Sequence, residues 1–295
     1  MELRIENLSK TYTNGVQALK NVSLTIPTGM FGLLGPNGAG KSTLMRTIAT
    51  LQEADHGTAV MDGIDVLKDK QAVRSALGYL PQEFGVYPKI SAEALLDHFA
   101  VLKGISDKKE RKDIVNALLQ QTNLYDVRKK NLGTFSGGMK QRFGIAQALL
   151  GNPRLIIVDE PTAGLDPAER NRFHNLLSEI GENVIVILST HIVDDVSDLC
   201  SNMAIINKGE VLLAGEPLKL MDGLKGKVWK KVVEKNQAAD HKARFTIISS
   251  RMYMGRVVLH AYGESQPDAS FEAIAPSLED VYFAAITRHQ VPAHV

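Results

Sequence analysis

The stretch G-P-N-G-A-G-K-S at residues 35–42 decides how the rest of this chain is interpreted. It matches the pattern G-x-x-x-x-G-K-[ST] of a phosphate-binding loop. An apolar run at residues 30–34 precedes it and suits a buried strand, whereas residues 43–48 suit the first turns of a helix. Strand, glycine-rich turn and helix form the context that this motif requires. The sequence therefore predicts a site for the phosphates of a nucleotide.

Each residue type in this loop has a physical role in binding phosphate. Glycines let backbone N–H groups converge on phosphate oxygens because they have no Cβ, and the helix N-terminus adds unpaired donors and partial positive charge. Lys41 is expected to reach the β- and γ-phosphates, and the hydroxyl of Ser42 is expected to ligate Mg²⁺. A chance match in a glycine-rich turn is the alternative, so the remaining motifs decide between the two.

Composition limits the class of protein. The chain has 295 residues, enough for one large domain or two, and its net charge of +1 gives no global attraction to nucleic acid. A single cysteine, Cys200, excludes an internal disulfide framework and fits a reducing compartment. The first residues lack the apolar core of a signal peptide, and no apolar run approaches the ~18 residues of a membrane-spanning helix. We therefore expect a soluble polypeptide, for which any membrane role needs a separate partner.

Apolar strand-like runs alternate with amphipathic helical patterns as far as about Gly215. The runs at residues 155–158, 184–188 and 203–206 are nearly continuous, and helical patterns separate them. This order predicts a parallel sheet that is covered by helices on both faces. Earlier strands are expected over residues 3–8 and 22–26, with shorter ones at 58–61 and 77–80.

The middle of the chain, from about residue 88 to 150, has a helical pattern of its own. Ser91 can cap a helix here, and a second helix follows it around Ile114, Leu118 and Leu119. The apolar face of the first helix is expected to comprise Leu95, Leu96, Phe99 and Leu102. We interpret residues 88–150 as a helical subdomain.

The character of the sequence changes after about residue 216. Lysines and arginines outnumber acidic residues from Lys219 to Arg244, and this stretch is expected to be a solvated helix face. Contact with anionic lipid headgroups is the alternative. Strands are expected over residues 245–248 and 256–259, with a break at Gly255, and Ser277 is expected to cap a last helix. We interpret residues 222–295 as a small α+β appendage to a main domain of residues 1–216.

Residues 155–160, L-I-I-V-D-E, form an apolar strand that ends in two carboxylates. An aspartate at the C-terminal end of a buried strand beside a phosphate loop is placed to bind Mg²⁺, which points to Asp159. The adjacent Glu160 could polarise a water for attack on the γ-phosphate. A strand followed by an acidic turn is the alternative. The phosphate loop earlier in the chain favours the functional interpretation.

A second pattern suited to anions lies at residues 136–138, S-G-G, in front of an amphipathic helix at 143–150. A serine and two glycines at a helix start leave backbone N–H groups free for an anion. Such a serine is more often only an N-cap. This chain, however, combines two glycine-rich anion loops about a hundred residues apart.

Taken in order, these motifs resemble the nucleotide-binding subunit of an ABC transporter. The match runs from about residue 2 to 216 and implies an α/β fold class: a P-loop NTPase core of ABC type with a helical signature-motif subdomain and a small C-terminal α+β appendage. It comprises the Walker A loop at 35–42, Gln82 as the Q-loop, the signature motif at 135–141, Walker B at 155–160, the D-loop at 163–166 and His191 as the switch histidine.

The resemblance implies a role for each matching residue. Tyr12 would stack on the base of ATP, and Gln82 would touch both Mg²⁺ and the attacking water. Asp159 would hold Mg²⁺ through water, Glu160 would be the general base, and His191 would contact the γ-phosphate. The phosphates and Mg²⁺ would be held by Gly35, Asn37, Gly38, Ala39, Gly40, Lys41, Ser42 and Thr43. Charge on the phosphoryl group would be stabilised by Lys41, Mg²⁺ and His191.

The resemblance also implies partners. Ser136, Gly137 and Gly138 would act on the nucleotide of the opposite subunit, in a head-to-tail dimer that sandwiches two ATP molecules with Asp166 near the seam. The expected partners are a second ATP-binding subunit, identical or paralogous, and a multispanning membrane permease, with no nucleic acid. The chain would then be cytoplasmic and peripheral at the inner face of the membrane.

Local departures from the commonest pattern indicate a branch of the family. Phe135 and Met139 stand where the commonest signature motif has Leu and Gln, but the phosphate-contacting S-G-G is intact. This form, and the stretch P-S-L-E-D-V-Y at 276–282, are similar to exporter ATPases associated with drug and antibiotic resistance. Residues 84–88 would line a groove that receives a short helix of the permease, with Phe84 as a core residue being the alternative.

Two other functions remain open at this point. The chain could be a soluble ABC ATPase that acts on a macromolecular assembly, although such relatives usually carry two nucleotide domains or long coiled-coil insertions. It could instead be a degenerate regulatory module, although every catalytic position is filled. The transported substrate is not determined by this sequence, since the permease selects it.

Overall fold

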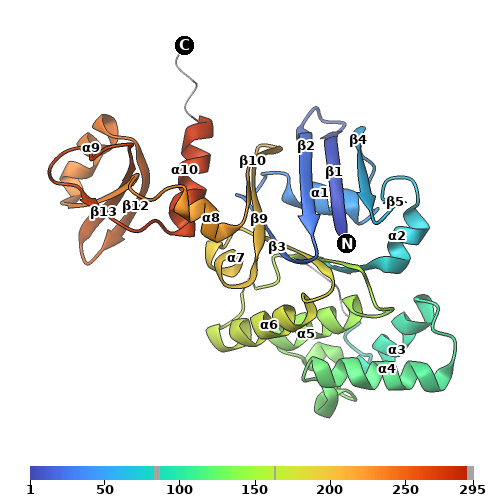
Figure 1. Cartoon of the computed structure of the whole chain (residues 1–295). Coiled ribbons are helices and arrows are strands. Elements are labelled where there is room, and N and C mark those ends of the chain that lie inside the picture. The colour runs from blue at the N-terminus through green and yellow to red at the C-terminus, as the bar shows by residue number, and fades with distance from the viewer. Residues whose placement is uncertain (83–84, 86, 163, 291–295) are drawn as a thin grey trace. The chain divides into compact units, whose positions relative to one another are not determined.

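The structure is a computed structural model that describes residues 1–82, 85, 87–162 and 164–290. The chain divides into two compact units, one of residues 1–202 and 206–211, the other of residues 203–205 and 212–295 (Figure 1). Each unit is described by itself. Among the described residues, no helix is long and apolar enough to cross a lipid bilayer.

A six-stranded sheet in the order β10-β9-β3-β8-β7-β6 carries the phosphate loop. Its strands are β3 (Gly29–Leu34), β6 (Leu77–Leu80), β7 (Leu155–Asp159), β8 (Ile185–Thr190), β9 (Asn202–Asn207) and β10 (Glu210–Gly215). The pairs β3–β8, β8–β7 and β7–β6 are parallel, as the sequence predicts. Every residue of β7 and β8 is buried because parallel strands are covered on both faces.

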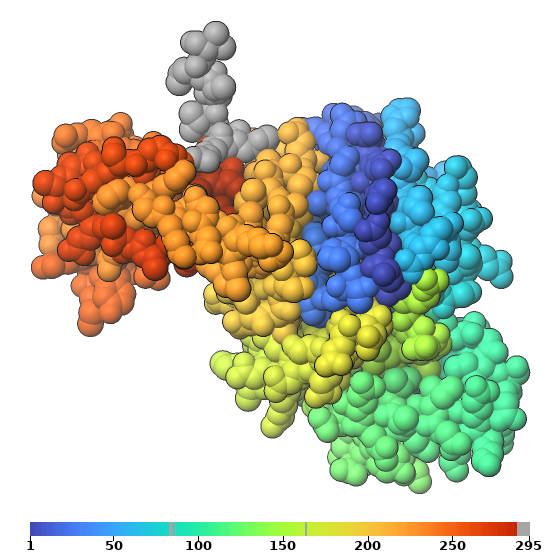
Figure 2. Space-filling model, viewed as in Figure 1, coloured from blue at the N-terminus to red at the C-terminus, as the bar shows by residue number. Residues whose placement is uncertain are grey.

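A second sheet, in the order β2-β1-β4-β5, is antiparallel. Its strands are β1 (Glu2–Thr11), β2 (Gln17–Pro27), β4 (His56–Met61) and β5 (Ile64–Asp65). Leu3 and Ile5 of β1 are buried, whereas Glu2 and Arg4 are exposed. This alternation is expected of a sheet with one face in the core and the other exposed to solvent. Figure 2 shows β1 and β2, in blue, side by side at the surface. The strands predicted at residues 3–8, 22–26 and 58–61 lie within β1, β2 and β4, whereas β5 and the antiparallel pairing were not predicted.

The first unit contains the helices α1 (Lys41–Ile48), α2 (Lys70–Ala76), α5 (Gly137–Ala148), α6 (Pro167–Ile180) and α7 (Val193–Leu199). Of these, α2 and α5 contact β6 and α7 contacts β3 and β8 of the parallel sheet, whereas α1 contacts β2 and α6 contacts α5 and α7. Helix α7 lies so close to β3 that a Cβ on Gly32 would approach Val196 Cγ1 to 2.6 Å. Gly32 therefore permits close packing of a helix on the strand that leads into the phosphate loop.

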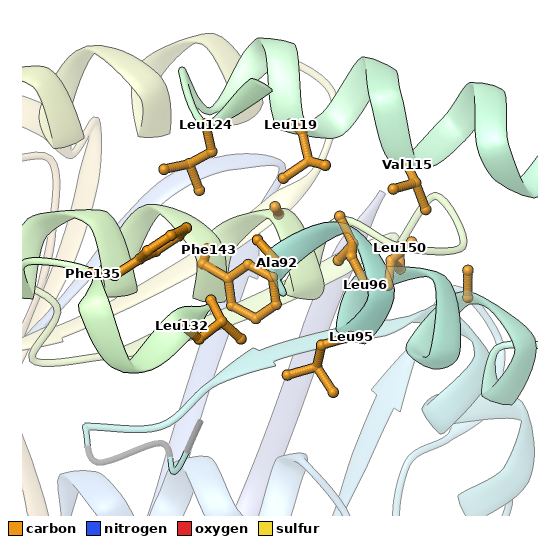
Figure 3. Packing of buried hydrophobic residues seen from close by; sticks show 12 residues of the cluster. Ala92, Leu95, Leu96, Val115, Leu119, Leu124, Leu132, Phe135, Phe143 and Leu150 are labelled. Atoms are coloured by element: carbon orange, nitrogen blue, oxygen red, sulfur yellow. The ribbon is translucent and has the colours of Figure 1, made fainter. Parts of the chain in front are cut away.

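The helical subdomain consists of α3 (Ala92–Leu102), α4 (Lys108–Gln121) and the start of α5, joined by short 3₁₀ turns at Tyr125–Val127 and Leu132–Thr134. Its core is the cluster of apolar side chains in Figure 3. Ser91 caps α3 as predicted, because its side chain accepts a hydrogen bond from Ala94 N. Leu102 was wrongly placed on the apolar face and is 70% exposed. It ends the helix at the edge of the buried stripe of Ala92, Leu96 and Ala100.

The second unit contains an antiparallel sheet in the order β12-β13-β11-β14. Its elements are α8 (Pro217–Asp222), β11 (Val228–Val233), a 3₁₀ turn (Lys235–Gln237), α9 (Ala238–Arg244), β12 (Ile247–Tyr253), β13 (Arg256–Tyr262), β14 (Glu272–Ala273) and α10 (Leu278–Gln290). The predicted strand at 256–259 lies within β13. Ser277 also caps α10 as predicted, since its hydroxyl accepts a hydrogen bond from Asp280 N at 3.3 Å.

One prediction for this unit is wrong, and a second has the wrong bounds. The basic stretch from Lys219 to Arg244 is not one helix face, because β11 divides it, and Lys230 and Lys231 pair with β13. The strand predicted at 245–248 begins at Ile247 and continues to Tyr253. In both places lysine or polar residues obscure the alternation, and the backbone pairing with β13 decides the structure.

Candidate functional site

The loop at residues 35–42 leads from β3 into α1, which confirms the predicted strand, turn and helix. Gly38 has φ of +78° and Gly40 has φ of +108°, values that L side chains rarely adopt. Space is also limited: a Cβ on Gly35 would lie 2.3 Å from Ile206 O, and one on Gly40 would lie 2.5 Å from Ala18 O. Glycine is therefore required at Gly35 and Gly40 by the backbone around them.

Lys41, the first residue of α1, folds back over the loop. Its Nζ donates hydrogen bonds to Gly35 O at 2.7 Å and to Pro36 O at 3.2 Å. Only 5% of the side chain is exposed, and this burial lowers the pKa of Lys41, while the carboxylates of Glu160 and Asp159 oppose the shift. The cation is thus fixed over the loop beside two carboxylates.

Glu160 follows the last residue of β7, and its carboxylate is contacted by side chains from three other segments of the chain. Its Oε2 accepts a hydrogen bond from Gln82 Nε2 at 3.3 Å. Its Oε1 lies 3.2 Å from His191 Nδ1 and 3.7 Å from Lys41 Nζ. The structure therefore brings all four predicted catalytic side chains together, although they come from four separate segments of the chain.

The backbone of Glu160 is itself unusual, with φ of +48°. Such a conformation costs an ordinary residue about 1–3 kcal/mol and persists where the surroundings fix it. Here the N–H of Glu160 donates to Ser189 O at 2.9 Å, in line with the pairing of Asp159 with Ser189 between β7 and β8. This geometry directs the carboxylate of Glu160 toward Lys41 and His191.

Asp159 is buried at the end of β7, and none of the described residues donates a hydrogen bond to its Oδ1. Burial and the neighbouring charge of Glu160 raise the pKa of Asp159, while the nearby hydroxyls of Ser189 and Ser42 and the charge of Lys41 oppose the shift. An unpartnered, buried carboxylate oxygen near a hydroxyl suits Mg²⁺, a hard cation that prefers oxygen ligands. Within the described residues, no cluster of three or more acidic, histidine or cysteine side chains could hold a metal alone.

A cavity of about 460 Å³ opens over the loop. Most of the predicted nucleotide-contacting residues line it: Tyr12, Asn37, Gly38, Ala39, Gly40, Lys41, Ser42, Thr43, Gln82 and Glu160. Tyr12 stands with 36% of its surface exposed, and its hydroxyl lies 3.1 Å from Thr43 Oγ1. Gly35, Asp159 and His191 are not among the lining residues.

Lys20 and Lys208 also line this cavity, and sequence reasoning missed both. Lys208 belongs to the turn between β9 and β10, where Gly209 N donates to Ala39 O at 2.9 Å and Lys20 N donates to Gly209 O at 2.8 Å. These backbone contacts attach the turn to the phosphate loop. The only local signal was the N-K-G turn sequence, which does not reveal what the turn contacts.

The second anion loop lies at the start of α5, and none of Ser136, Gly137 and Gly138 lines the cavity of the same chain. Ser136 caps α5 by accepting a hydrogen bond from Met139 N at 3.2 Å. Phe135 is buried in the core of the helical subdomain (Figure 3), so the aromatic residue anchors the signature loop there. The two anion loops therefore belong to different elements of one chain.

The remaining predicted segments lie partly outside the described residues. Phe84 and Val86 of the proposed permease groove are outside them, whereas Tyr87 is 62% exposed. Of the D-loop, Ala163 is outside them. Asp166 caps α6, since its Oδ1 accepts a hydrogen bond from Glu169 N at 2.9 Å.

Comparison with known proteins gives the same family. The sequence profile described as "ABC transporter" matches residues 19–163. The linearmycin resistance ATP-binding protein LnrL of Bacillus subtilis is 32% identical over 88% of this chain and 82% of its own length. A solved dimeric structure of the ATP-binding cassette MJ0796, bound to ADP and Pi, has a TM-score of 0.66 at 27% identity and matches 72% of this chain and 98% of the cassette.

The probable multidrug ABC transporter ATP-binding protein YbhF of Escherichia coli is 36% identical over 71% of this chain. The chain spans only 36% of the length of that relative. The match to LnrL, in contrast, extends over most of both proteins. Together with the phosphate loop and the four side chains that meet at Glu160, these similarities show that the chain belongs to the ABC transporter family, among its ATP-binding proteins.

Proposed function

We propose that this chain hydrolyses ATP as the motor subunit of an exporter, with residues 1–216 as its ATP-binding domain. The observation that carries the proposal is the convergence of Gln82, His191 and Lys41 on the carboxylate of Glu160, beside a cavity that the phosphate loop lines. A carboxylate in this position can accept the proton of an attacking water. The surrounding groups can stabilise charge on the phosphoryl group that is transferred.

Binding of the nucleotide follows from the lining of the cavity. The ring of Tyr12 stands at its exposed side and would stack on the base. The N–H groups of residues 37–43 and the ammonium of Lys41 would hold the phosphates. Gly35 begins this loop and lets its backbone pass close to Ile206 O. His191, which already contacts Glu160, would contact the γ-phosphate.

Mg²⁺ fits the same site. Ser42 would ligate it directly, Asp159 would hold it through water, and Gln82 would complete the contacts from the protein. When bound, the ion would offset the charge of the phosphate oxygens. Glu160 is left to act on water, because its oxygens face Gln82, His191 and Lys41 rather than Asp159.

The signature residues suggest that the site is completed by a second subunit. Ser136, Gly137 and Gly138 suit an anion, but they line no part of the cavity in their own chain. In a head-to-tail dimer they would face the nucleotide of the partner, with Asp166 near the seam. The related cassette MJ0796, which is described as dimeric, supports the pairing of two such subunits.

Export through a separate membrane permease is the transport role that we infer. The relatives named for multidrug transport and linearmycin resistance support it, as does the P-S-L-E-D-V-Y stretch at 276–282. The chain would then lie at the cytoplasmic face of the membrane, bound to the permease. The permease would choose the cargo.

Purification from membranes in gentle detergent tests this function. We expect the tagged chain to carry a multispanning protein with it, and the complex to hydrolyse ATP in the presence of Mg²⁺. Extraction at high salt gives a control for loose electrostatic adsorption. A chain that hydrolyses ATP but recovers no multispanning partner would contradict the transport role alone. A chain that binds no ATP would contradict the whole proposal.

A further inference from the structure

A buried carboxylate behind the site, Asp195 of α7, connects the loops that carry the catalytic residues. It is 0% exposed. Its Oδ2 accepts hydrogen bonds from the hydroxyl of Thr162 at 2.7 Å and from the hydroxyl of Thr190 at 3.1 Å. Thr162 lies two residues after Glu160, and Thr190 lies directly before His191. One oxygen therefore joins the loop after β7 to the last residue of β8, directly before His191.

The other oxygen of Asp195 connects to helix α6. Its Oδ1 accepts a hydrogen bond from Arg170 Nε at 2.9 Å and lies 2.9 Å from His174 Nε2. Arg170 and His174 are one turn apart on α6, and the N-cap of this helix is Asp166. The start of α6 is therefore attached to both catalytic loops through a single side chain.

The contacts continue to the backbone on both sides of His191. Thr190 donates its hydroxyl to Asp195, and the same hydroxyl accepts a hydrogen bond from Ile192 N at 2.9 Å. The backbone is thus held immediately before and after the histidine. On the other loop, Leu165 N donates to Thr162 O at 3.2 Å, which continues the turn toward Asp166.

We propose that Asp195 is a positioning residue, which sets the spacing between Glu160 and His191 and ties both to helix α6. The inference rests on the proposed hydrolysis of ATP at this site. A buried ion pair adds little stability on average, because apolar residues of similar volume often pack as well. A carboxylate that accepts hydrogen bonds from three segments instead fixes one geometry, and catalysis depends on such geometry at the level of about 1 Å.

The first test compares Asp195→Asn with Asp194→Asn in the full chain. Asp198 is 64% exposed but lies 3.9 Å from His174, so the better control on the same helix is Asp194→Asn, at an exposed site, which tests the loss of one charge and the change in helix propensity. We expect Asp195→Asn to lower kcat at least about tenfold and to leave the affinity for ATP within about threefold of the wild type, because the phosphate loop is untouched. Rates are measured well below the unfolding temperature of each variant, per folded molecule.

Thr162 supplies a second test that does not remove a buried charge. Thr162→Val keeps the shape of the side chain but loses the hydroxyl, whereas Thr162→Ser keeps the hydroxyl. We expect the Val variant to lower kcat and the Ser variant to retain most of the rate. In the Asp195→Asn background, Thr162→Val is expected to lower kcat little further, because both substitutions act on the same hydrogen bond between Thr162 and Asp195. If the hydroxyl of Thr162 were only structural, its loss would lower the unfolding temperature, but kcat and the affinity for ATP would both stay near their wild-type values.

The outcomes separate this inference from the function on which it rests. A wild-type chain that binds ATP but never hydrolyses it would overturn the proposed function, and the inference with it. An active wild type matched in kcat by a folded Asp195→Asn variant would overturn the inference alone. If Asp195→Asn does not fold, the Thr162 pair decides: equal rates for the Val and Ser variants would overturn the positioning role.

Discussion

Glu160 Oε1 and His191 Nδ1 lie 3.2 Å apart at the ends of the neighbouring strands β7 and β8. Because Asp159 pairs with Ser189 in the parallel sheet, β7 and β8 end side by side and the residues that follow them lie close together. The φ of +48° at Glu160 directs its carboxylate toward the histidine. This contact places a candidate base beside a candidate γ-phosphate contact.

Replacing Glu160 by glutamine should separate binding from chemistry. Glu160→Gln keeps the shape of the side chain but cannot take a proton from water, so hydrolysis should fall by about a hundredfold or more. Affinity for ATP should persist because the phosphate loop is unchanged. Steady-state phosphate release and nucleotide titration measure the two effects. Glu179→Gln, an exposed site on α6, is the control, and normal hydrolysis by Glu160→Gln would show that another group is the base.

Cysteine pairs can test the head-to-tail dimer. Asn37, in the phosphate loop, and Ser136, in the signature loop, are both exposed. With Asn37→Cys and Ser136→Cys in one chain, ATP should promote a disulfide between subunits, seen as a band of doubled mass on a non-reducing gel. Burial strongly raises the pKa of the only native thiol, Cys200, so it should not compete.

A different pair serves as the control for this dimer. Asn37→Cys with Ser106→Cys also places two exposed thiols in the chain, but Ser106 lies in the linker before α4 rather than in the signature loop. This pair should form no disulfide between subunits under the same conditions, so it should run as a monomer on the non-reducing gel. If both pairs cross-linked equally, the contacts between subunits would be nonspecific, and the head-to-tail arrangement would lose its support.

Gly40→Ala should damage the phosphate loop. The new Cβ would lie 2.5 Å from Ala18 O, a backbone atom, and φ would have to remain near +108°. We expect at least a tenfold weaker affinity for ATP, since a loop shift misplaces its N–H groups. Gly15→Ala is the matched control: its φ is +82°, but no atom lies within 4 Å of the added Cβ. Nucleotide titration distinguishes the two, and equal affinities would contradict the steric argument.

Asp280 should make the stability of the second unit sensitive to acid. Burial by itself would raise the pKa of Asp280, but hydrogen bonds from His260, at 2.6 Å, and Ser277 outweigh it and lower that pKa. A lowered pKa in the folded state means that the stabilisation is present above the unfolded value, about pH 4, and is lost as pH falls through the folded value.

Asp280→Asn should therefore unfold more easily at neutral pH, by about 1–3 kcal/mol, and depend less on pH below about pH 4. Trp229 is the only tryptophan of the chain and lies in β11, so its fluorescence during urea unfolding reports on this unit. Asp222→Asn, at an exposed site, is the control. An unchanged slope of stability against pH would exclude a role for Asp280.

Much of the fold could be predicted where one face or both faces of an element are apolar over a continuous run. The strands β3, β7 and β8 and the helix that follows Gly40 are of this kind. The antiparallel pairing of β1 with β2 and β4, and the strand β11 in the lysine-rich stretch, could not be predicted, because hydrogen bonds to distant backbone segments define them.

The sequence by itself determined the chemistry of this protein. Its motifs are short and local: the phosphate loop at residues 35–42, the pair Asp159 and Glu160, and His191. These motifs were also enough to identify the family. Only the tertiary structure decided which groups meet. The contacts of Glu160 with Gln82 and His191, the attachment of the β9–β10 turn to the phosphate loop, and the three segments joined by Asp195 all span long stretches of chain. Such contacts arise from sheet register and burial, which no short stretch of sequence contains.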